Sequence, residues 1–133
     1  MHSLYTDGGA RGNPGPAATG YFIFSPEGEL VDFGGDYLGE DTNNGAEYKG
    51  IIAGLKLAAK HGIKLLKCNM DSELIVMQLN GAYRVKHPNL KPLFEEVKAL
   101  RDKFEELKFV HIRRELNSHA DKMVNSILDA IAK

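Results

Sequence analysis

The sequence predicts an α/β fold built on a five-stranded mixed sheet, with the first three strands antiparallel, the later strands parallel, and helices on both faces. Three β-rich segments occupy the first 37 residues, and a short proline–glycine turn joins the second to the third. Short turns of this kind join antiparallel strands. From residue 44 onward, helical apolar patterns alternate with short apolar runs, which favours parallel strands joined by helices. A length of 133 residues predicts one domain, residues 1–133.

The first half of the chain predicts strands followed by one long helix. The order is strand 2–7, a glycine- and proline-rich loop to residue 16, strand 19–25, turn 26–29, strand 30–37 and helix 44–60. Residues 19–25 are rich in β-branched and aromatic side chains, which favour strands. The helix is predicted from apolar residues at helical spacing, and Gly62 is expected to stop it.

The second half predicts two more strands and three helices. A short apolar strand, 65–70, ends just before Asp71, and Ser72 is expected to cap a helix of residues 73–80. After a basic loop, Asn89 is expected to cap a longer helix with one apolar face, which comprises Leu90, Leu93, Val97, Leu100 and Phe104. Strand 107–113 follows. Asn117 is then expected to cap a last helix that carries Val124, Ile127, Leu128 and Ile131.

The composition is that of a globular protein, with 43% hydrophobic and 26% charged residues. Cys68 is the only cysteine, which excludes an intramolecular disulfide and a cysteine zinc site. No apolar run has the length of a membrane span, and no signal peptide pattern is present. We therefore expect a cytoplasmic monomer without membrane contact.

The charge distribution is uneven although the net charge is −1. Residues 1–50 contain two basic residues against eight acidic ones, whereas residues 83–114 contain nine basic residues against five acidic ones. This asymmetry permits a basic face beside an acidic metal-binding centre. The competing interpretation is an ordinary, patchy charged surface.

Four acidic residues each lie at a predicted junction between elements: Asp7, Glu47, Asp71 and Asp121. Their surroundings are TDGGARGNPGP (6–16), TNNGAEY (42–48), MDSE (70–73) and NSHAD (117–121). Two of the acids end predicted strands, and ends of parallel strands meet at one sheet edge. The other two fall in predicted first turns of helices, where the dipole favours carboxylates.

Carboxylates gathered in this way predict a site for hard divalent cations such as Mg²⁺. Two such ions roughly 3.5–4 Å apart activate a water and stabilise a leaving oxygen during phosphodiester hydrolysis. For any single acid, a simple role at a helix end, stabilised by the dipole, is the better explanation. The set of four favours one metal site.

With these phrases, the chain resembles type 1 ribonuclease H from Tyr5 to about Ile127. The resemblance implies the ribonuclease H fold and metal-dependent cleavage of the RNA strand of RNA–DNA hybrids, leaving 5′-phosphate and 3′-hydroxyl ends. It implies two Mg²⁺ or Mn²⁺ ions. Asp7 would bridge both ions, Glu47 and Asp71 would hold one, and Asp121 would complete the other.

The resemblance also implies substrate-binding residues. Asn13, Asn43 and Asn44 match positions that contact RNA 2′-hydroxyls in the family, and the backbone at Gly8 and Gly9 would approach the strand closely. Ser72 lies near the substrate in family terms. The competing interpretation is local: asparagine suits turns and caps, and Ser72 suits a helix N-cap.

Two departures from the larger relatives bear on the activity. The chain has no tryptophan, and only the short basic loop 83–87 stands where relatives carry a basic protrusion. It also lacks the loop histidine that precedes the last ligand in relatives. His119, Arg113 and Arg114 are therefore candidate auxiliary residues. This compact ending is similar to archaeal and short bacterial forms, some of which are associated with cleavage of double-stranded RNA.

Two alternatives stay open from the sequence. One is a nuclease of the same fold with another or additional substrate, such as double-stranded RNA or a DNA strand-transfer intermediate. The other is a non-catalytic module that binds hybrids, which the presence of all four carboxylates disfavours.

Overall fold

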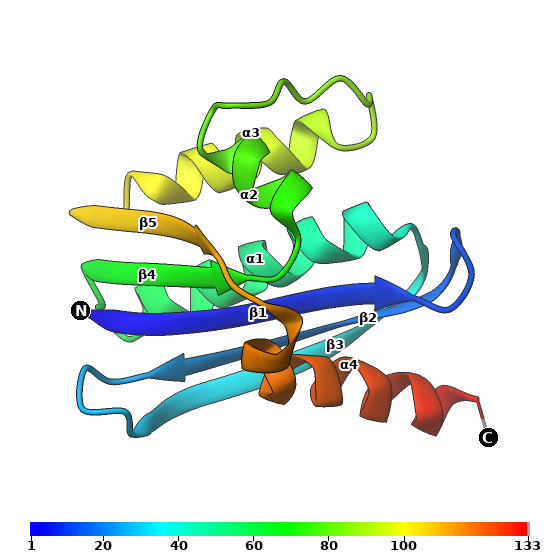
Figure 1. Cartoon of the computed structure of the whole chain (residues 1–133), viewed down its shortest axis with the longest axis horizontal. Coiled ribbons are helices and arrows are strands. Elements are labelled where there is room, and N and C mark those ends of the chain that lie inside the picture. The colour runs from blue at the N-terminus through cyan, green and yellow to red at the C-terminus, as the bar shows by residue number, and fades with distance from the viewer. Residues whose placement is uncertain (133) are drawn as a thin grey trace.

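The sheet has the strand order β3-β2-β1-β4-β5 in a computed structural model that describes residues 1–132 (Figure 1). The strands are β1 (His2–Ala10), β2 (Gly15–Phe24), β3 (Leu30–Asp41), β4 (Leu65–Met70) and β5 (Glu106–His111). β2 pairs antiparallel with β1 and β3, whereas β4 pairs parallel with β1 and β5. The predicted five-stranded mixed sheet is confirmed.

Helices cover both faces of this sheet, as predicted. They are α1 (Asn43–Lys60), α2 (Glu73–Leu79), α3 (Lys91–Arg101) and α4 (Ser118–Ile131), and a short 3₁₀ helix, η1 (Arg114–Asn117), precedes α4. Successive strand residues point to opposite faces. A side chain at Gly8 would overlap the Ala46 carbonyl of α1, whereas one at Gly9 would contact Val124 of α4. The two helices therefore pack on opposite faces, as Figure 1 also shows.

The two faces differ greatly in the size of their cores. Between the sheet, α1 and α3 lies a large buried cluster, the α1-side core, whose fully buried members include Leu4, Ile51, Leu55 and Leu66. Beneath α4 lies a small cluster, the α4-side core, made of Ala18, Val124 and Leu128 with Ile127 packed against them. Within the described residues, no helix is both long enough and apolar enough to cross a membrane.

The first strand is longer than predicted, and this corrects the placement of Asp7. β1 continues to Ala10 and pairs with β2 up to Ala10↔Ala17, so that Asp7 lies inside the strand, opposite Gly20. The composition of residues 8–16 suggested a loop because glycine is uncommon in strands. At Gly8 the absence of a side chain instead lets the helix α1 backbone pack directly against β1.

Helix starts were predicted with mixed success. Ser72 caps α2 as expected, and its hydroxyl accepts a hydrogen bond from the Ile75 N–H. The Asn89 cap is wrong: Leu90 occupies the cap position of α3, without a side-chain hydrogen bond, and a proline stands in the first turn. Asn117 occupies the cap position of α4 but makes no capping bond, because the hydrogen bond from its Nδ2 to the Thr6 carbonyl holds the side chain against β1.

Two smaller boundaries also differ. Phe104 lies beyond the end of α3 but is buried in the α1-side core. Glu47 lies beyond the first turn of α1, which Thr42 caps by accepting from the Gly45 N–H. The helix dipole therefore acts on Glu47 less directly than the sequence suggested. Asp121 does lie in the first turn of α4.

Candidate active site

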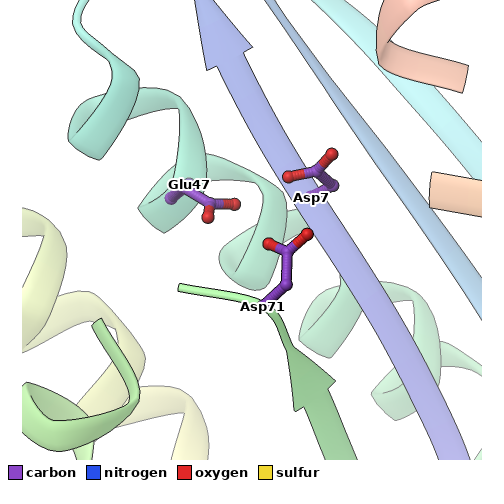
Figure 2. A group of neighbouring side chains, drawn as sticks. All are labelled: Asp7, Glu47 and Asp71. Carbon is purple, nitrogen blue, oxygen red and sulfur yellow. The ribbon is translucent and has the colours of Figure 1, made fainter. Parts of the chain in front are cut away.

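Three of the four predicted carboxylates meet at one point. Asp7 comes from the middle of β1, Glu47 from α1, and Asp71 directly follows β4. One ligand oxygen from each lies within 4.8 Å of the others, and Figure 2 shows the three side chains pointing toward one another. We call this group the carboxylate cluster.

The sheet and α1 together create the space for this cluster. The parallel ladder between β1 and β4 ends at Tyr5↔Asn69, after which β1 continues alongside β2 only. Asp71 follows where β4 leaves the sheet, and so reaches the flank of β1 beside Asp7. The close approach of α1 to Gly8 brings Glu47 to the same flank.

Burial and mutual repulsion make the cluster electrostatically unfavourable when it is fully ionised. Burial and then the charge of Asp71 raise the pKa of Asp7 to about 7, although the Gly8 N–H opposes the shift. The pKa of Glu47 is raised well above its ordinary value by burial and then by the charges of Asp7 and Asp71. Burial also raises the pKa of Asp71, against the nearby Arg114 cation.

This arrangement fits a divalent cation. Three carboxylates supply the oxygen donors that hard cations take, and their spacing allows oxygens from all three to share one ion. A bound cation would replace the protons that the cluster otherwise retains. The raised pKa values thus arise because carboxylates suited to a metal ion lie close together in a partly buried place.

Asp121 lies apart from the carboxylate cluster but on the same cleft. This cleft, of about 340 Å³, is lined by Asp7, Glu47 and Asp121 together with Arg114. Asp121 is close enough for its charge to contribute to the raised pKa of Asp7, behind burial and Asp71. Its Oδ1 lies 3.9 Å from Nη2 of Arg114. The cleft therefore joins the fourth predicted acid to Asp7 and Glu47.

The predicted substrate-binding asparagines connect the β1–β2 loop with the start of α1. The Asn13 Oδ1 accepts from the Asn43 N–H at 3.0 Å, and the Asn43 Oδ1 accepts from the Ala10 N–H at 2.8 Å. Asn44 lines both the carboxylate cleft and a neighbouring cavity of about 480 Å³ that Asn13 also lines. Gly8, Gly9, Asn43 and Ser72 line the carboxylate cleft.

The three auxiliary candidates lie in different surroundings. Arg114 lines the carboxylate cleft. Arg113 is exposed before η1 and is not among the cleft residues. His119 faces away, with its ring centroid 5.5 Å from that of Phe22 and 5.9 Å from that of Phe24. The structure therefore brings only Arg114 to the acids.

The sequence interpretation missed the role of Asn117. It was predicted to cap α4, yet its buried amide donates to the carbonyl oxygen of Thr6, the residue of β1 that precedes Asp7. Its position four residues before Asp121 was the available signal, since residues four apart lie near each other on a helix.

Comparison with known proteins places the chain in a family. The family model described as "Reverse transcriptase-like" matches residues 5–127. Ribonuclease HI of Halobacterium salinarum is 40% identical over 125 residues, which are 94% of this chain and 63% of that protein. A bifunctional protein of Mycobacterium tuberculosis is 40% identical over 131 residues, 98% of this chain and 36% of that protein. The chain thus spans between about a third and two thirds of these curated relatives.

Solved structures give the same result over their full length. RNase H1 from the archaeon Halobacterium salinarum superposes with a TM-score of 0.94 at 39% identity, over 97% of this chain and 98% of that chain. LC11-RNase H1, solved in complex with an RNA/DNA hybrid, superposes with a TM-score of 0.95 at 40% identity, over the whole of both chains. The chain therefore belongs to the reverse transcriptase-like family, as a member of the type 1 ribonucleases H.

Proposed function

We propose that this chain is a metal-dependent endoribonuclease that cleaves the RNA strand of RNA–DNA hybrids and leaves 5′-phosphate and 3′-hydroxyl ends. The observation that carries the proposal is the carboxylate cluster, in which oxygens of Asp7, Glu47 and Asp71 lie within 4.8 Å of one another. The similarity to LC11-RNase H1, which was solved with an RNA/DNA hybrid, supports hybrid as the substrate.

The ions that suit this site are Mg²⁺ or Mn²⁺, two per molecule. Asp7 would be shared by both, Glu47 and Asp71 would complete one, and Asp121 would complete the other. Two ions held in this way supply an activated water and neutralise charge on the scissile phosphate. The separation of Asp121 from the carboxylate cluster, on the same cleft, supports a second ion position distinct from the first.

The residues around the cluster would orient the RNA strand. A protein distinguishes RNA from DNA through the 2′-hydroxyl, which both donates and accepts hydrogen bonds. Side-chain oxygens of Asn13 and Asn43 already accept backbone N–H groups, which fixes both side chains and leaves their NH₂ groups to donate to ribose. The backbone at Gly8 and Gly9, together with Asn44 and Ser72, would complete the contact surface.

Arg114 would contribute positive charge beside the departing phosphate. Its guanidinium lies 3.9 Å from Asp121 and its side chain is 80% exposed, so it can move toward an incoming phosphate without losing a buried partner. Arg113 and His119 do not line the cleft. Of the three auxiliary candidates, Arg114 is therefore the one we assign to the reaction.

A duplex-cleavage panel tests the proposal. The protein is incubated with labelled RNA–DNA hybrid, double-stranded RNA and double-stranded DNA, each with Mg²⁺, Mn²⁺ or EDTA, and its mass is measured by light scattering. We expect a monomer that cuts the RNA strand of the hybrid with either metal and not with EDTA. Cleavage of double-stranded RNA as well would widen the substrate class. Binding of hybrid without cleavage by either metal would instead support the non-catalytic module.

A further inference from the structure

Asn117 occupies a buried position between three of the elements that carry the acids. It lies at the junction of η1 and α4, and its side chain is 1% exposed. Its Nδ2 donates to the carbonyl oxygen of Thr6 at 2.8 Å, across 111 residues of sequence. Because Thr6 directly precedes Asp7, this bond ties the start of α4 to β1 next to the first acid.

The bond fills a place that the sheet leaves open. The ladder between β1 and β4 ends at Tyr5↔Asn69, so β4 presents no ladder partner to Thr6. A buried carbonyl without a donor is costly, and the Asn117 amide supplies the donor. The start of α4 is thereby anchored at the point where Asp71 leaves the end of β4.

The same side chain lies near Asp71. Burial raises the pKa of Asp71 overall, whereas the Arg114 cation and the nearby Asn117 amide lower it. Asp121 follows one helical turn after Asn117, and residues with this spacing are neighbours on a helix surface. A single amide thus ties β1 beside Asp7 to the turn that carries Asp121, close to the Asp71 carboxylate.

A purely structural role explains this arrangement less well. The Asn117 Oδ1 is buried and has no hydrogen-bond partner among residues 1–132. An unpartnered buried oxygen costs stability, which offsets the gain from the bond to Thr6. The unpartnered oxygen does not change the position that the bond gives to the start of α4. Fixing this position therefore explains the buried amide better than a contribution to stability does.

We propose that Asn117 is the positioning residue that sets Asp121 against the carboxylate cluster and so completes the second half of the metal site. This inference rests on the proposed function, since it concerns the same ions. Residues that orient metal ligands without touching the ion contribute about 10–100-fold in metal affinity. For Asn117 the effect should fall on the ion that Asp121 shares.

Mn²⁺ binding, measured by isothermal titration calorimetry, tests the inference. We expect Asn117→Ala to weaken the lower-affinity Mn²⁺ step about 10–100-fold. The matched control is Asn80→Ala, because Asn80 also donates its amide to a strand carbonyl, that of Phe109 at 3.1 Å, away from the acids. This control should leave Mn²⁺ affinity within about twofold of wild type, as expected for a change outside the metal site. Asn117→Ser, which keeps a donor, should bind Mn²⁺ with intermediate affinity and serves if the alanine variant does not fold.

A double-mutant cycle separates positioning from general destabilisation. If Asn117 acts through Asp121, adding Asn117→Ala to an Asp121→Asn variant should change Mn²⁺ affinity by less than about threefold, because the effects of coupled residues are not additive. A full 10–100-fold effect in that background would overturn the inference, as would an Asn117→Ala protein that binds Mn²⁺ like wild type. A wild-type protein that neither binds Mn²⁺ nor cuts hybrid would overturn the proposed function itself.

Discussion

The two faces of the sheet hold the four acids by different means. Asp7 and Glu47 belong to elements that enclose the α1-side core, and Asp71 directly follows another. The buried residues of this core come from β1, β2, β4 and β5 as well as from the helices. Asp121 belongs to α4, which contributes Val124 and Leu128 to the much smaller α4-side core. Hydrogen bonds must therefore contribute to holding α4 on the sheet, whereas on the other face apolar packing is sufficient to hold the helices.

This difference implies two levels of rigidity within one site. Elements that share a large core open only when the whole domain unfolds, whereas elements with few buried contacts open locally at lower free energy. The carboxylate cluster should persist as long as the domain is folded. The position of Asp121 should depend on how firmly α4 is held, near its start by the buried Asn117 and near its end by Arg11 at the surface.

The largest expected effect is a difference in hybrid cleavage rate between the Asp7→Asn and Asp121→Asn variants. Electrostatic stabilisers of a transition state are each worth about 10²–10³ in rate, and Asp7 is the ligand that both proposed ions share. Asp7→Asn should therefore lower the hybrid cleavage rate at least about 10³-fold, with hybrid binding retained in a gel-shift assay. Asp121→Asn should recover part of its activity as Mn²⁺ is raised. If both variants stay equally inactive at every Mn²⁺ concentration, the two levels of rigidity do not exist.

The next effect compares the two cores in stability. Leu55 in the α1-side core is fully buried, and Leu128 in the α4-side core is 4% exposed. Truncating a buried leucine to alanine costs about 2–5 kcal/mol, and we expect Leu55→Ala at the upper end of this range and Leu128→Ala at the lower end. Urea unfolding measures both. The Leu128→Ala variant should be more stable than the Leu55→Ala variant and yet bind Mn²⁺ less tightly than it does. The reverse order of Mn²⁺ affinities would contradict the comparison between the two cores.

The third effect is a pH dependence that arises in the carboxylate cluster. The pKa of Asp7 rises from 3.8 to about 7 on folding, chiefly through burial. Between these values the folded state retains a proton that the unfolded state releases, so the free energy of unfolding falls as pH rises, by at most about 1.4 kcal/mol per pH unit for one group. Urea unfolding in EDTA at pH 4, 5.5 and 7 measures this slope.

Two variants and one ion sharpen the pH measurement. Asp7→Asn should flatten the slope between pH 4 and 7, whereas Asp129→Asn, at an exposed carboxylate on α4, should leave it unchanged. Saturating Mg²⁺ should stabilise the protein increasingly as pH rises, because the ion binds the ionised carboxylates. A stability in EDTA that rises with pH over this range would contradict the placement of Asp7 in a buried acidic cluster.

Local patterns in the sequence were sufficient to predict the order of elements and where two of the four acids lie within them. Asp71 at the end of a short apolar strand and Asp121 in the first turn of a helix follow from periodicity and capping rules. The fold class followed from short turns in the first part of the chain and helical connections in the second. These features depend on neighbours within a few residues.

Features that depend on distant residues were not predictable in the same way. β1 continues through its glycines because α1 packs against Gly8, which no local rule reveals. Asn117 serves a carbonyl 111 residues away instead of its own helix. His119 packs beside Phe22 and Phe24 of β2, so its distance from the acids depends on how α4 lies on the sheet.

The smallest expected effect concerns the surface tie that holds α4. Nη2 of Arg11 lies 2.6 Å from Oδ1 of Asp129, and the two side chains are 43% and 67% exposed. Exposed ion pairs contribute about 0–1 kcal/mol and are screened by salt. Arg11→Ala should therefore lower the free energy of unfolding by less than about 0.5 kcal/mol. The difference should vanish in 1 M NaCl, because the screening length is then roughly 3 Å.

This variant also decides whether Arg11 serves only the ion pair with Asp129 or also contacts a substrate phosphate. If the side chain serves only the tie to Asp129, Arg11→Ala and Asp129→Asn should have equal, small effects on stability and none on hybrid affinity. Arg11 lines the carboxylate cleft as well, so a phosphate contact would appear as weaker hybrid binding in Arg11→Ala but not in Asp129→Asn. In that case hybrid would draw Arg11 away from α4, and the buried Asn117 bond would be the tie that keeps Asp121 in place during binding.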